Sequence, residues 1–196
     1  DDVKTTLRPR KDRKLPGLRK EGEGANVNAN TLEYQGAGGK AIYSGTAALW
    51  QGQTAIRGET ITLDQAKGDL VASGAARSTL MLDSGSSDGT GDEIRYDDAK
   101  RLITYNAPPI VLPAVAVLPA AQSHLIGAQG DIRADRIESK LGTAKGRTDK
   151  LEAYPSVTVR VDTPGAPVPR VHLLPDDPAS PLRRPPQASI FRSVGD

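Results

Sequence analysis

The side chains that could support catalysis or metal binding lie far apart along the chain. Asp131, Asp135 and Glu138 have the spacing of one helix face, but an internal repeat places them on a strand and its turn. His124 and His172 have no partner at the spacing of a metal site or a catalytic triad. No serine lies in a nucleophile elbow, including Ser44 and Ser73. We therefore expect no enzymatic activity, no metal site and no cofactor.

Two further types of chemistry are excluded by the same reasoning. The chain contains no cysteine, so it has no disulfide framework and no thiolate. The acidic, glycine-rich stretch at 83–93 lacks the ligand spacing of a calcium loop, and we expect it to be a hairpin connection.

Charge and proline divide the 196-residue chain into three segments. The 26 Lys and Arg residues nearly balance the 24 Asp and Glu residues, which argues against a dedicated nucleic-acid-binding protein. Residues 1–20 hold eight basic and three acidic side chains, whereas residues 164–196 hold eight of the 15 prolines. We expect a basic, disordered arm over 1–25, a folded body over 26–163 and a flexible tail over 164–196.

The basic arm has two interpretations. Its Lys and Arg side chains suit anionic lipid phosphates or an anionic membrane surface, and the alternative is a solvated tail without a ligand. It has no interleaved aromatic residues, so nucleic acid is not an expected partner. No apolar segment follows the basic residues, so we predict no signal peptide in this sequence; one was cleaved, or the protein is cytosolic.

The longest apolar run, at 110–121, belongs to a proline-rich insertion at 108–122. The run has twelve residues and is broken by Pro113 and Pro119, whereas a membrane-spanning helix needs about twenty, so none is predicted. Three roles for the insertion stay open: a flap over a groove, a surface for a partner, or a loop packed onto its own sheet.

The body contains an internal repeat. Tyr34 and Tyr96 are 62 residues apart, as are Tyr43 and Tyr105, and residues 56–61 resemble residues 132–137. Apolar residues alternate over five to eight positions between Gly and Asp clusters, which predicts short strands that are mostly antiparallel. Turns are expected at 35–39, 51–53, 64–68, 83–91, 97–100 and 142–146.

The repeated segments resemble the LptA/OstA-like domain of the lipopolysaccharide transport system, over about residues 26–162. The resemblance rests on Leu49-Trp50-Gln51-Gly52, on Ile56-Arg57-Gly58-Glu59-Thr60-Ile61, and on a second pass through Gly91-Asp92-Glu93-Ile94-Arg95-Tyr96 and Gly130-Asp131-Ile132-Arg133-Ala134. The insertion and the proline-rich tail are not part of the family pattern.

The resemblance implies an all-β fold, a twisted open β-jellyroll whose inner surface shields the acyl chains of lipid A in the periplasm. It also implies two kinds of partner: lipopolysaccharide, and related jellyroll proteins of the inner-membrane and outer-membrane transport complexes. Edge-to-edge homo-oligomers are a further expectation. A carrier needs a continuous apolar trough, because a chain of about ten methylenes would cost about 8 kcal/mol to expose to water.

Alternation within the strands predicts which side chains face this trough. The inward, lipid-binding positions are Tyr43, Ala47, Leu49, Ile56, Ile61, Leu63, Leu70, Ile94, Tyr96, Leu102, Tyr105, Ile132, Ile137 and Leu151. For each of them, ordinary core packing is the alternative. At the level of the whole protein, the alternative is a structural β-repeat protein that assembles edge to edge and carries no lipid.

Overall fold

A computed structural model describes residues 2–8, 14–17, 24–36, 39–107, 122–128, 130–142, 147–154, 157–160 and 172–173. This part of the chain is almost entirely β-strand, which confirms the all-β prediction. In chain order the strands are β1 (Val3–Leu7), β2 (Ala25–Ala29), β3 (Thr31–Gln35), β4 (Lys40–Gln51), β5 (Thr54–Asp64), β6 (Asp69–Leu82), β7 (Gly85–Asp97), β8 (Leu102–Asn106), β9 (Ser123–Gly127), β10 (Gly130–Ala134), β11 (Arg136–Leu141), β12 (Thr148–Tyr154), β13 (Thr158–Arg160) and β14 (His172–Leu173).

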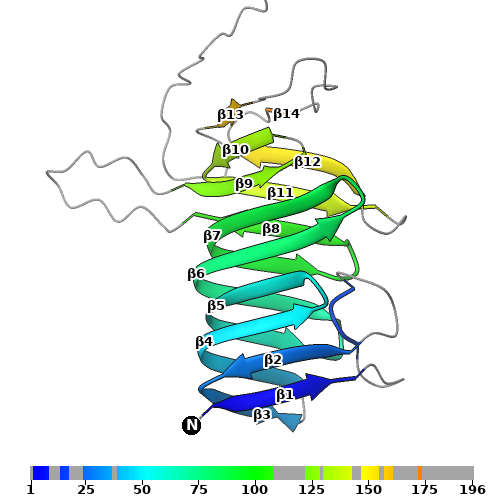
Figure 1. Cartoon of the computed structure of the whole chain (residues 1–196), viewed down its shortest axis with the longest axis vertical. Coiled ribbons are helices and arrows are strands. Elements are labelled where there is room, and N and C mark those ends of the chain that lie inside the picture. Colours follow the sequence, from blue (N-terminus) through cyan, green and yellow to red (C-terminus); the bar gives the residue numbers. More distant parts are fainter. Residues whose placement is uncertain are drawn as a thin grey trace, which may run out of the picture.

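These strands form one 14-stranded sheet whose main path runs β1-β2-β4-β5-β6-β7-β8-β11-β12-β14. The path ends at β1 and β14 without closing into a ring, as Figure 1 shows. Neighbours pair antiparallel, apart from the parallel pair of β12 and β14. Most antiparallel neighbours follow each other in sequence and are joined by short hairpins. The order of the strands along the sheet therefore largely follows their order in the sequence.

The middle strands are longer than the sequence predicts, because each one bends and continues. β4 to β7 have 11 to 14 residues, and their pairing shifts register part-way along each strand. At the bend of β4 lies Gly45, with φ of 82°, and at the bend of β6 lies Gly74, with φ of 79°. Glycine takes this left-handed conformation without the steric cost that a Cβ brings, which explains two of the many glycines.

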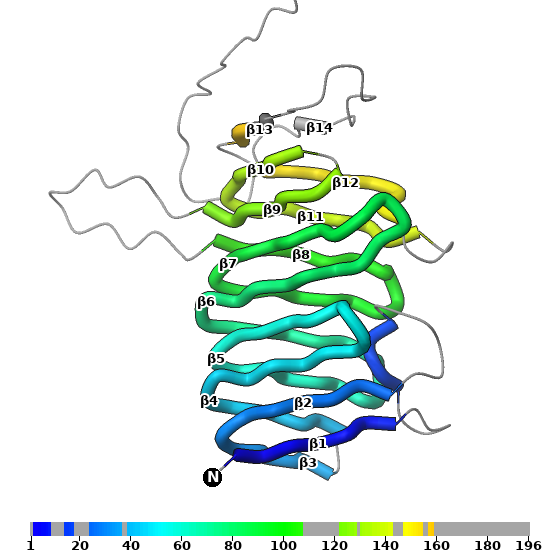
Figure 2. Tube along the Cα trace, viewed as in Figure 1, coloured from blue at the N-terminus to red at the C-terminus, as the bar shows by residue number. Residues whose placement is uncertain are grey.

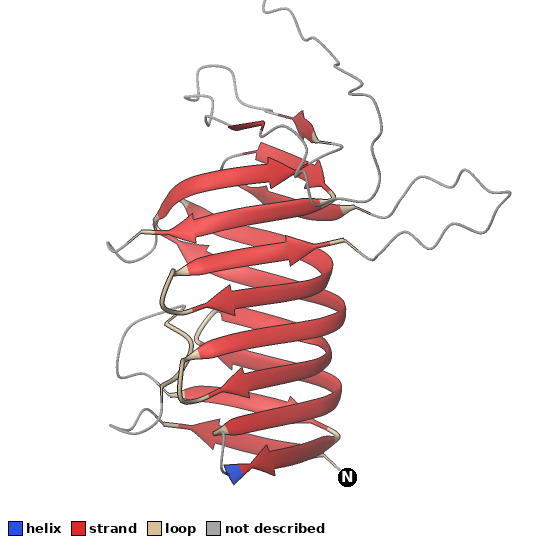
Figure 3. Ribbon diagram, turned by 180° about the vertical axis from the view of Figure 1, so that it is seen from behind, coloured by secondary structure: helices blue, strands red, loops and turns tan. Residues whose placement is uncertain are grey.

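The bends lie above one another along one side of the molecule. A Cβ on Gly58 would lie 2.7 Å from the carbonyl oxygen of Ser73, and one on Gly91 would lie 2.8 Å from that of Asn106. Each bent strand therefore crosses from the front of the molecule to its back, a path that the tube in Figure 2 and the rear view in Figure 3 both follow. The hairpin loops gather on the opposite side.

The bends divide the sheet into two facing layers, which we call layer A and layer B. Layer A contains β1, β2, β9, β10, β13, and the parts of β4 to β7 that carry residues 47–51, 54–58, 76–82 and 85–91. Layer B contains β3, β8, β11, β12, β14, and the parts that carry residues 40–44, 60–64, 69–73 and 93–97.

Two expectations about the chain organisation are wrong. The stretch at 83–91 is not a long hairpin connection, because β7 already begins at Gly85 and residues 85–91 pair with β6. The arm over 1–25 is not disordered throughout, because β1 pairs with β2 and Lys14 donates a backbone hydrogen bond to Gln65. β1 lies at the edge of the sheet and carries the polar residues Lys4 and Thr6 at its exposed positions. Its apolar and polar alternation is therefore weak in the sequence. The insertion at 108–121 and most of the tail lie outside the described residues.

Candidate functional site: the interior between the two layers

The interior between layers A and B is lined by the alternating apolar residues of both. Thirteen of the fourteen predicted inward residues are buried there: Tyr43, Ala47, Leu49, Ile56, Ile61, Leu63, Leu70, Ile94, Tyr96, Tyr105, Ile132, Ile137 and Leu151. Ile56 and Ile61 are five positions apart, yet both point inward, because the bend of β5 lies between them and shifts the alternation.

Leu102 is the exception, and its predicted inward position is wrong. It is half-buried, while its neighbour Ile103 is fully buried and belongs to the interior cluster. Residues 103 and 105 share a face of a straight strand, and 102 and 105 do not, so Tyr105 already excluded Leu102 from the inner face. The prediction also missed other inward residues, among them Val27, Ala72, Ala76, Leu80, Leu125, Ala134 and Ala153.

Tyrosine side chains tie the two layers together across the interior. The Tyr105 hydroxyl in layer B lies 2.9 Å from Ser78 Oγ in layer A, and both side chains are buried. A side chain on Gly89 of layer A would overlap the Tyr105 ring, so the ring packs directly against that backbone. Burial raises the pKa of Tyr105 to about 12, and the hydrogen bond between Tyr105 and Ser78 partly offsets this effect.

Tyr43 makes a similar link between the layers, whereas Tyr96 bonds within layer B. Tyr43 in layer B hydrogen-bonds Thr5 of β1 in layer A, and burial raises its pKa. Tyr96 donates to Asp98 Oδ1 at 3.1 Å; burial, followed by the negative charge of Asp98, raises its pKa. All three hydroxyl groups therefore stay protonated and uncharged at neutral pH, which suits an apolar interior.

The interior is uncovered at the end formed by β3. Leu32 pairs with Tyr43, and Tyr34 pairs with Ala41, so both point to the same side of layer B as those inward residues. Nevertheless Leu32 is 39% exposed and Tyr34 is 46% exposed. We call these two residues the β3 mouth. The repeat offered the signal for them, because Leu32 and Tyr34 correspond to Ile94 and Tyr96 one repeat later.

Comparison with known families decides what this domain is. The family described as LptA/(LptD N-terminal domain) LPS transport protein matches residues 26–107, which run from β2 through β8. Residues 26–107 form an LptA/OstA-like domain. The recognition made from the sequence is confirmed, and the match stops where the insertion begins.

A solved structure supports the same fold over a longer stretch. LptH, the LptA-homologous periplasmic component of the lipopolysaccharide transport device of Pseudomonas aeruginosa, is 19% identical to this chain. It matches with a TM-score of 0.52, covering 86% of this chain and 100% of the LptH chain. At this identity the likeness shows the fold alone, the open β-jellyroll. No curated protein matches the chain.

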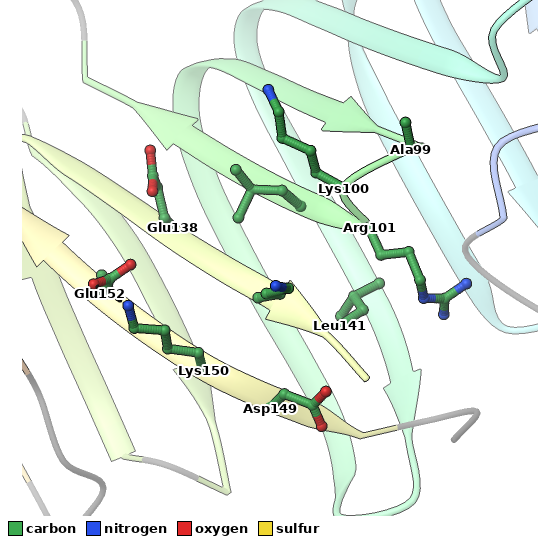
Figure 4. Close-up of a pocket in the computed structure, with 10 residues that line it drawn as sticks. Ala99, Lys100, Arg101, Glu138, Leu141, Asp149, Lys150 and Glu152 are labelled. Carbon is green, nitrogen blue, oxygen red and sulfur yellow. Dashed lines mark ion pairs between the residues drawn. The ribbon is translucent and has the colours of Figure 1, made fainter. Parts of the chain in front are cut away.

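The LptA-like fold also carries a shallow hollow on the outer surface of layer B, where Leu102 lies. Figure 4 shows charged side chains of both signs around it. Lys150 pairs with Glu152 at 2.6 Å, and Arg101 Nε donates to the Gly142 carbonyl oxygen, so these cations already have partners. An acyl chain is not expected to bind here, because several of the side chains that line the hollow are charged and pair with one another or with the backbone. The hollow is lined by Ala99, Lys100, Arg101, Leu102, Glu138, Lys140, Leu141, Asp149, Lys150 and Glu152.

The polar residues singled out in the sequence lie on outer surfaces. His124 Nε2 lies 2.6 Å from Asp131 Oδ1, and Arg133 Nε lies 3.7 Å from the same oxygen, which forms a small ion-pair cluster on the outside of layer A. Glu138 accepts from Arg136 and from Tyr154 on the outside of layer B. Within the described ranges, no group of three His, Asp or Glu side chains could hold a metal ion. No helix among the described residues is long and apolar enough to cross a membrane.

Proposed function

We propose that this chain is a periplasmic lipopolysaccharide-transport module that holds the acyl chains of lipid A between layers A and B. The LptA-like domain supports a role in lipopolysaccharide transport at a general level. The observation that carries the finer proposal is a continuous row of inward apolar residues from both layers that ends in the exposed β3 mouth. Transfer of about ten methylenes into such an interior is favourable by about 8 kcal/mol.

Lipid binding requires the two layers to separate. Side chains fill the interior, and Tyr43, Tyr96 and Tyr105 are among its largest buried members. The layers are joined covalently along the bends, whereas hairpin loops line the opposite side. The bends therefore act as a hinge, and the loop side opens. The energy for transfer comes from partner proteins, so the chain itself needs no cofactor.

Partners join at the ends of the sheet. β1 pairs only with β2, and β3 pairs only with β4, so both strands are edges of the described sheet at the end that carries the β3 mouth. Unpaired edges accept a further strand through backbone hydrogen bonds. Related jellyrolls of the inner-membrane and outer-membrane complexes would thereby extend one interior across several proteins, and a second copy of this chain could add in the same way.

Photo-crosslinking tests the proposed lipid position. A photoreactive amino acid replaces Leu49 or Ile61, which point inward, or the adjacent Ala48 or Thr62, which point to the opposite face. We expect saturable lipopolysaccharide binding by all four variants, with crosslinks from residues 49 and 61 and few from 48 and 62. Absence of saturable binding, together with absence of crosslinks from the inward positions, would overturn the proposal.

The second function left open is a structural β-repeat protein that assembles edge to edge without lipid. The filled interior favours it, because a packed core needs no ligand for stability. Size-exclusion chromatography separates the two functions. Rods that grow with protein concentration, in a protein that binds no lipopolysaccharide, support the structural function, whereas behaviour that changes on lipid addition supports transport.

A further inference from the structure

Residues 14–17 form a short segment, which we call the strap, that lies along the loop side of the molecule. Lys14 donates its backbone N–H to the Gln65 carbonyl oxygen at 2.7 Å, in the loop between β5 and β6. Gly17 donates its N–H to Asp98 Oδ1 at 3.0 Å, in the loop between β7 and β8. The strap thus spans two successive loops of layer B, and Figures 1 and 2 place it on the side opposite the bends.

The strap also touches the interior. Pro16 is buried, and Leu15 is partly buried and packs against the interior cluster. Gln65, to which the strap binds, is only 5% exposed, and its Oε1 atom has no hydrogen-bond partner among the described residues. The strap therefore covers apolar and polar groups that would otherwise face water along the side on which the layers must part.

Asp98 links the strap to the interior. Its Oδ1 atom accepts from the Gly17 N–H and from the Tyr96 hydroxyl, and its own N–H donates to Asp69 Oδ1 at 3.0 Å. A Cβ on Gly17 would lie 2.8 Å from Asp98 Oδ1 and 3.3 Å from the Tyr96 hydroxyl, so only glycine approaches this closely. Tyr96 lies in the interior, so a movement of its side chain changes the position of Asp98 and with it the hydrogen bond between Asp98 and Gly17.

Within the described residues, the strap has fewer anchoring hydrogen bonds than the strands around it. The hydrogen bonds given above join it to only two residues of layer B, Gln65 and Asp98, whereas β5 and β6 pair through a ladder along most of their length. Segments with few anchoring contacts open locally at much lower free energy than ladder strands do. The strap is thus built to detach while the sheet stays folded.

We propose that the strap is a releasable closure of the loop side, and that an acyl chain passes sideways into the interior when Asp98 releases Gly17. This inference rests on the proposed function, because it assumes that the interior takes lipid. It adds the side of the molecule through which lipid passes and the residue that controls passage. Lipid that displaces Tyr96 weakens the Asp98 contact, so occupancy and strap release favour each other.

A crosslinked strap tests the proposal. The chain contains no cysteine, so Gly17→Cys and Asp98→Cys introduce a unique pair, closed by oxidation or by a short thiol-reactive linker. In the reduced form the bond between Gly17 and the Asp98 carboxylate is absent, because Asp98 is replaced. In the crosslinked form the strap cannot leave the loop between β7 and β8. We expect the closed form to bind fluorescent lipopolysaccharide at least tenfold more slowly than the reduced form. Equal association rates would overturn the proposal.

Hydrogen exchange provides a second readout that needs no lipid. Asp98→Ala should speed exchange of the Lys14 and Gly17 amides at least tenfold and leave exchange of the β5 amides unchanged. Asp97→Ala is the matched control, because Asp97 pairs with Lys100 and not with strap residues 14–17. It should leave exchange of the strap amides unchanged. Strap amides that exchange as slowly as β5 in both variants would overturn strap release. Absence of lipopolysaccharide binding in every form, with fast strap exchange in Asp98→Ala, would overturn the proposed function and the sideways route while leaving strap release established.

Discussion

The hydrogen bond between Tyr105 and Ser78 gives the sharpest test of the two-layer interior. It joins layer B to layer A at 2.9 Å, and Tyr105 is 0% exposed while Ser78 is 4% exposed. Tyr105→Phe removes one partner and leaves the Ser78 hydroxyl buried without its bond. Ser78→Ala does the reverse. The double variant removes both polar groups at once.

The expected magnitudes follow from burial. A buried polar group that loses its partner costs about 1–3 kcal/mol, so each single variant should lower the free energy of unfolding by an amount in that range. The double variant leaves no hydroxyl unpaired at this contact, so its loss should be smaller than the sum of the two single losses. The difference is the coupling energy between the two side chains, and we expect about 1 kcal/mol.

Urea unfolding followed by circular dichroism measures all four proteins of this cycle. Tyr154→Phe serves as the control, because the Tyr154 hydroxyl donates to Glu138 on the outer surface and is partly exposed, and it should cost clearly less than Tyr105→Phe. Single losses that simply add, with no coupling between Tyr105 and Ser78, would refute the claim that this bond holds the layers together.

Three further predictions test the bends, the inward face and the interior tyrosines. Gly74→Ala should lower the free energy of unfolding by at least about 1–2 kcal/mol, because φ is 79° at this residue. Gly36→Ala should change it little, because no atom lies closer than 3.8 Å to the place of its Cβ. Urea unfolding measures both variants. By the same assay, Ile103→Ala should cost about 2–5 kcal/mol and Leu102→Ala clearly less, and the opposite order would contradict the assigned face. The pKa of Tyr105 is raised from 10.0 to about 12 on folding, so the stability from its protonated hydroxyl is fully present below pH 10 and is lost as pH rises toward 12. Unfolding measured over this pH range should therefore show a smaller loss of stability in Tyr105→Phe than in the unmodified protein. Equal losses would contradict this origin.

Strand content and most inward positions were predictable because alternation is a local property. Residues such as Ile61 and Leu63 occupy every second position of a strand, so their shared face follows from the sequence directly. The repeat of Tyr43 and Tyr105 then marked equivalent places in layer B. Leu102 is apolar like the inward residues, but it is three positions from Tyr105 and therefore lies on the other face of β8, so its predicted inward position is wrong.

The bends were not predictable from alternation, because they depend on neighbouring strands. Gly45 adopts its left-handed conformation where Asn30 of the adjacent segment approaches it, with Asn30 Nδ2 2.6 Å from the place of a Cβ. A glycine that permits such a contact looks in the sequence like a glycine that ends a strand. Each bent strand was therefore expected as short strands, and the division into two layers emerged only from the pairing.

The strap was missed for a related reason. Its sequence, Lys14-Leu15-Pro16-Gly17, has neither strand alternation nor a helical period, and it lies in a basic segment typical of disorder. What holds it in place is Asp98, which is more than eighty residues later and whose side chain accepts the Gly17 N–H. A contact between two loops at that separation leaves no periodic signal in either of them.

The separation of the two layers on lipid binding tests the central claim most directly. Spin labels at Arg77 of layer A and Arg95 of layer B, both exposed, report the distance across the interior by pulsed electron paramagnetic resonance, and labels at Arg57 and Arg133 report a distance within layer A. We predict that lipopolysaccharide lengthens the first distance and leaves the second unchanged. Saturating lipopolysaccharide that binds the protein but changes neither distance would contradict the claim that acyl chains lie between the layers.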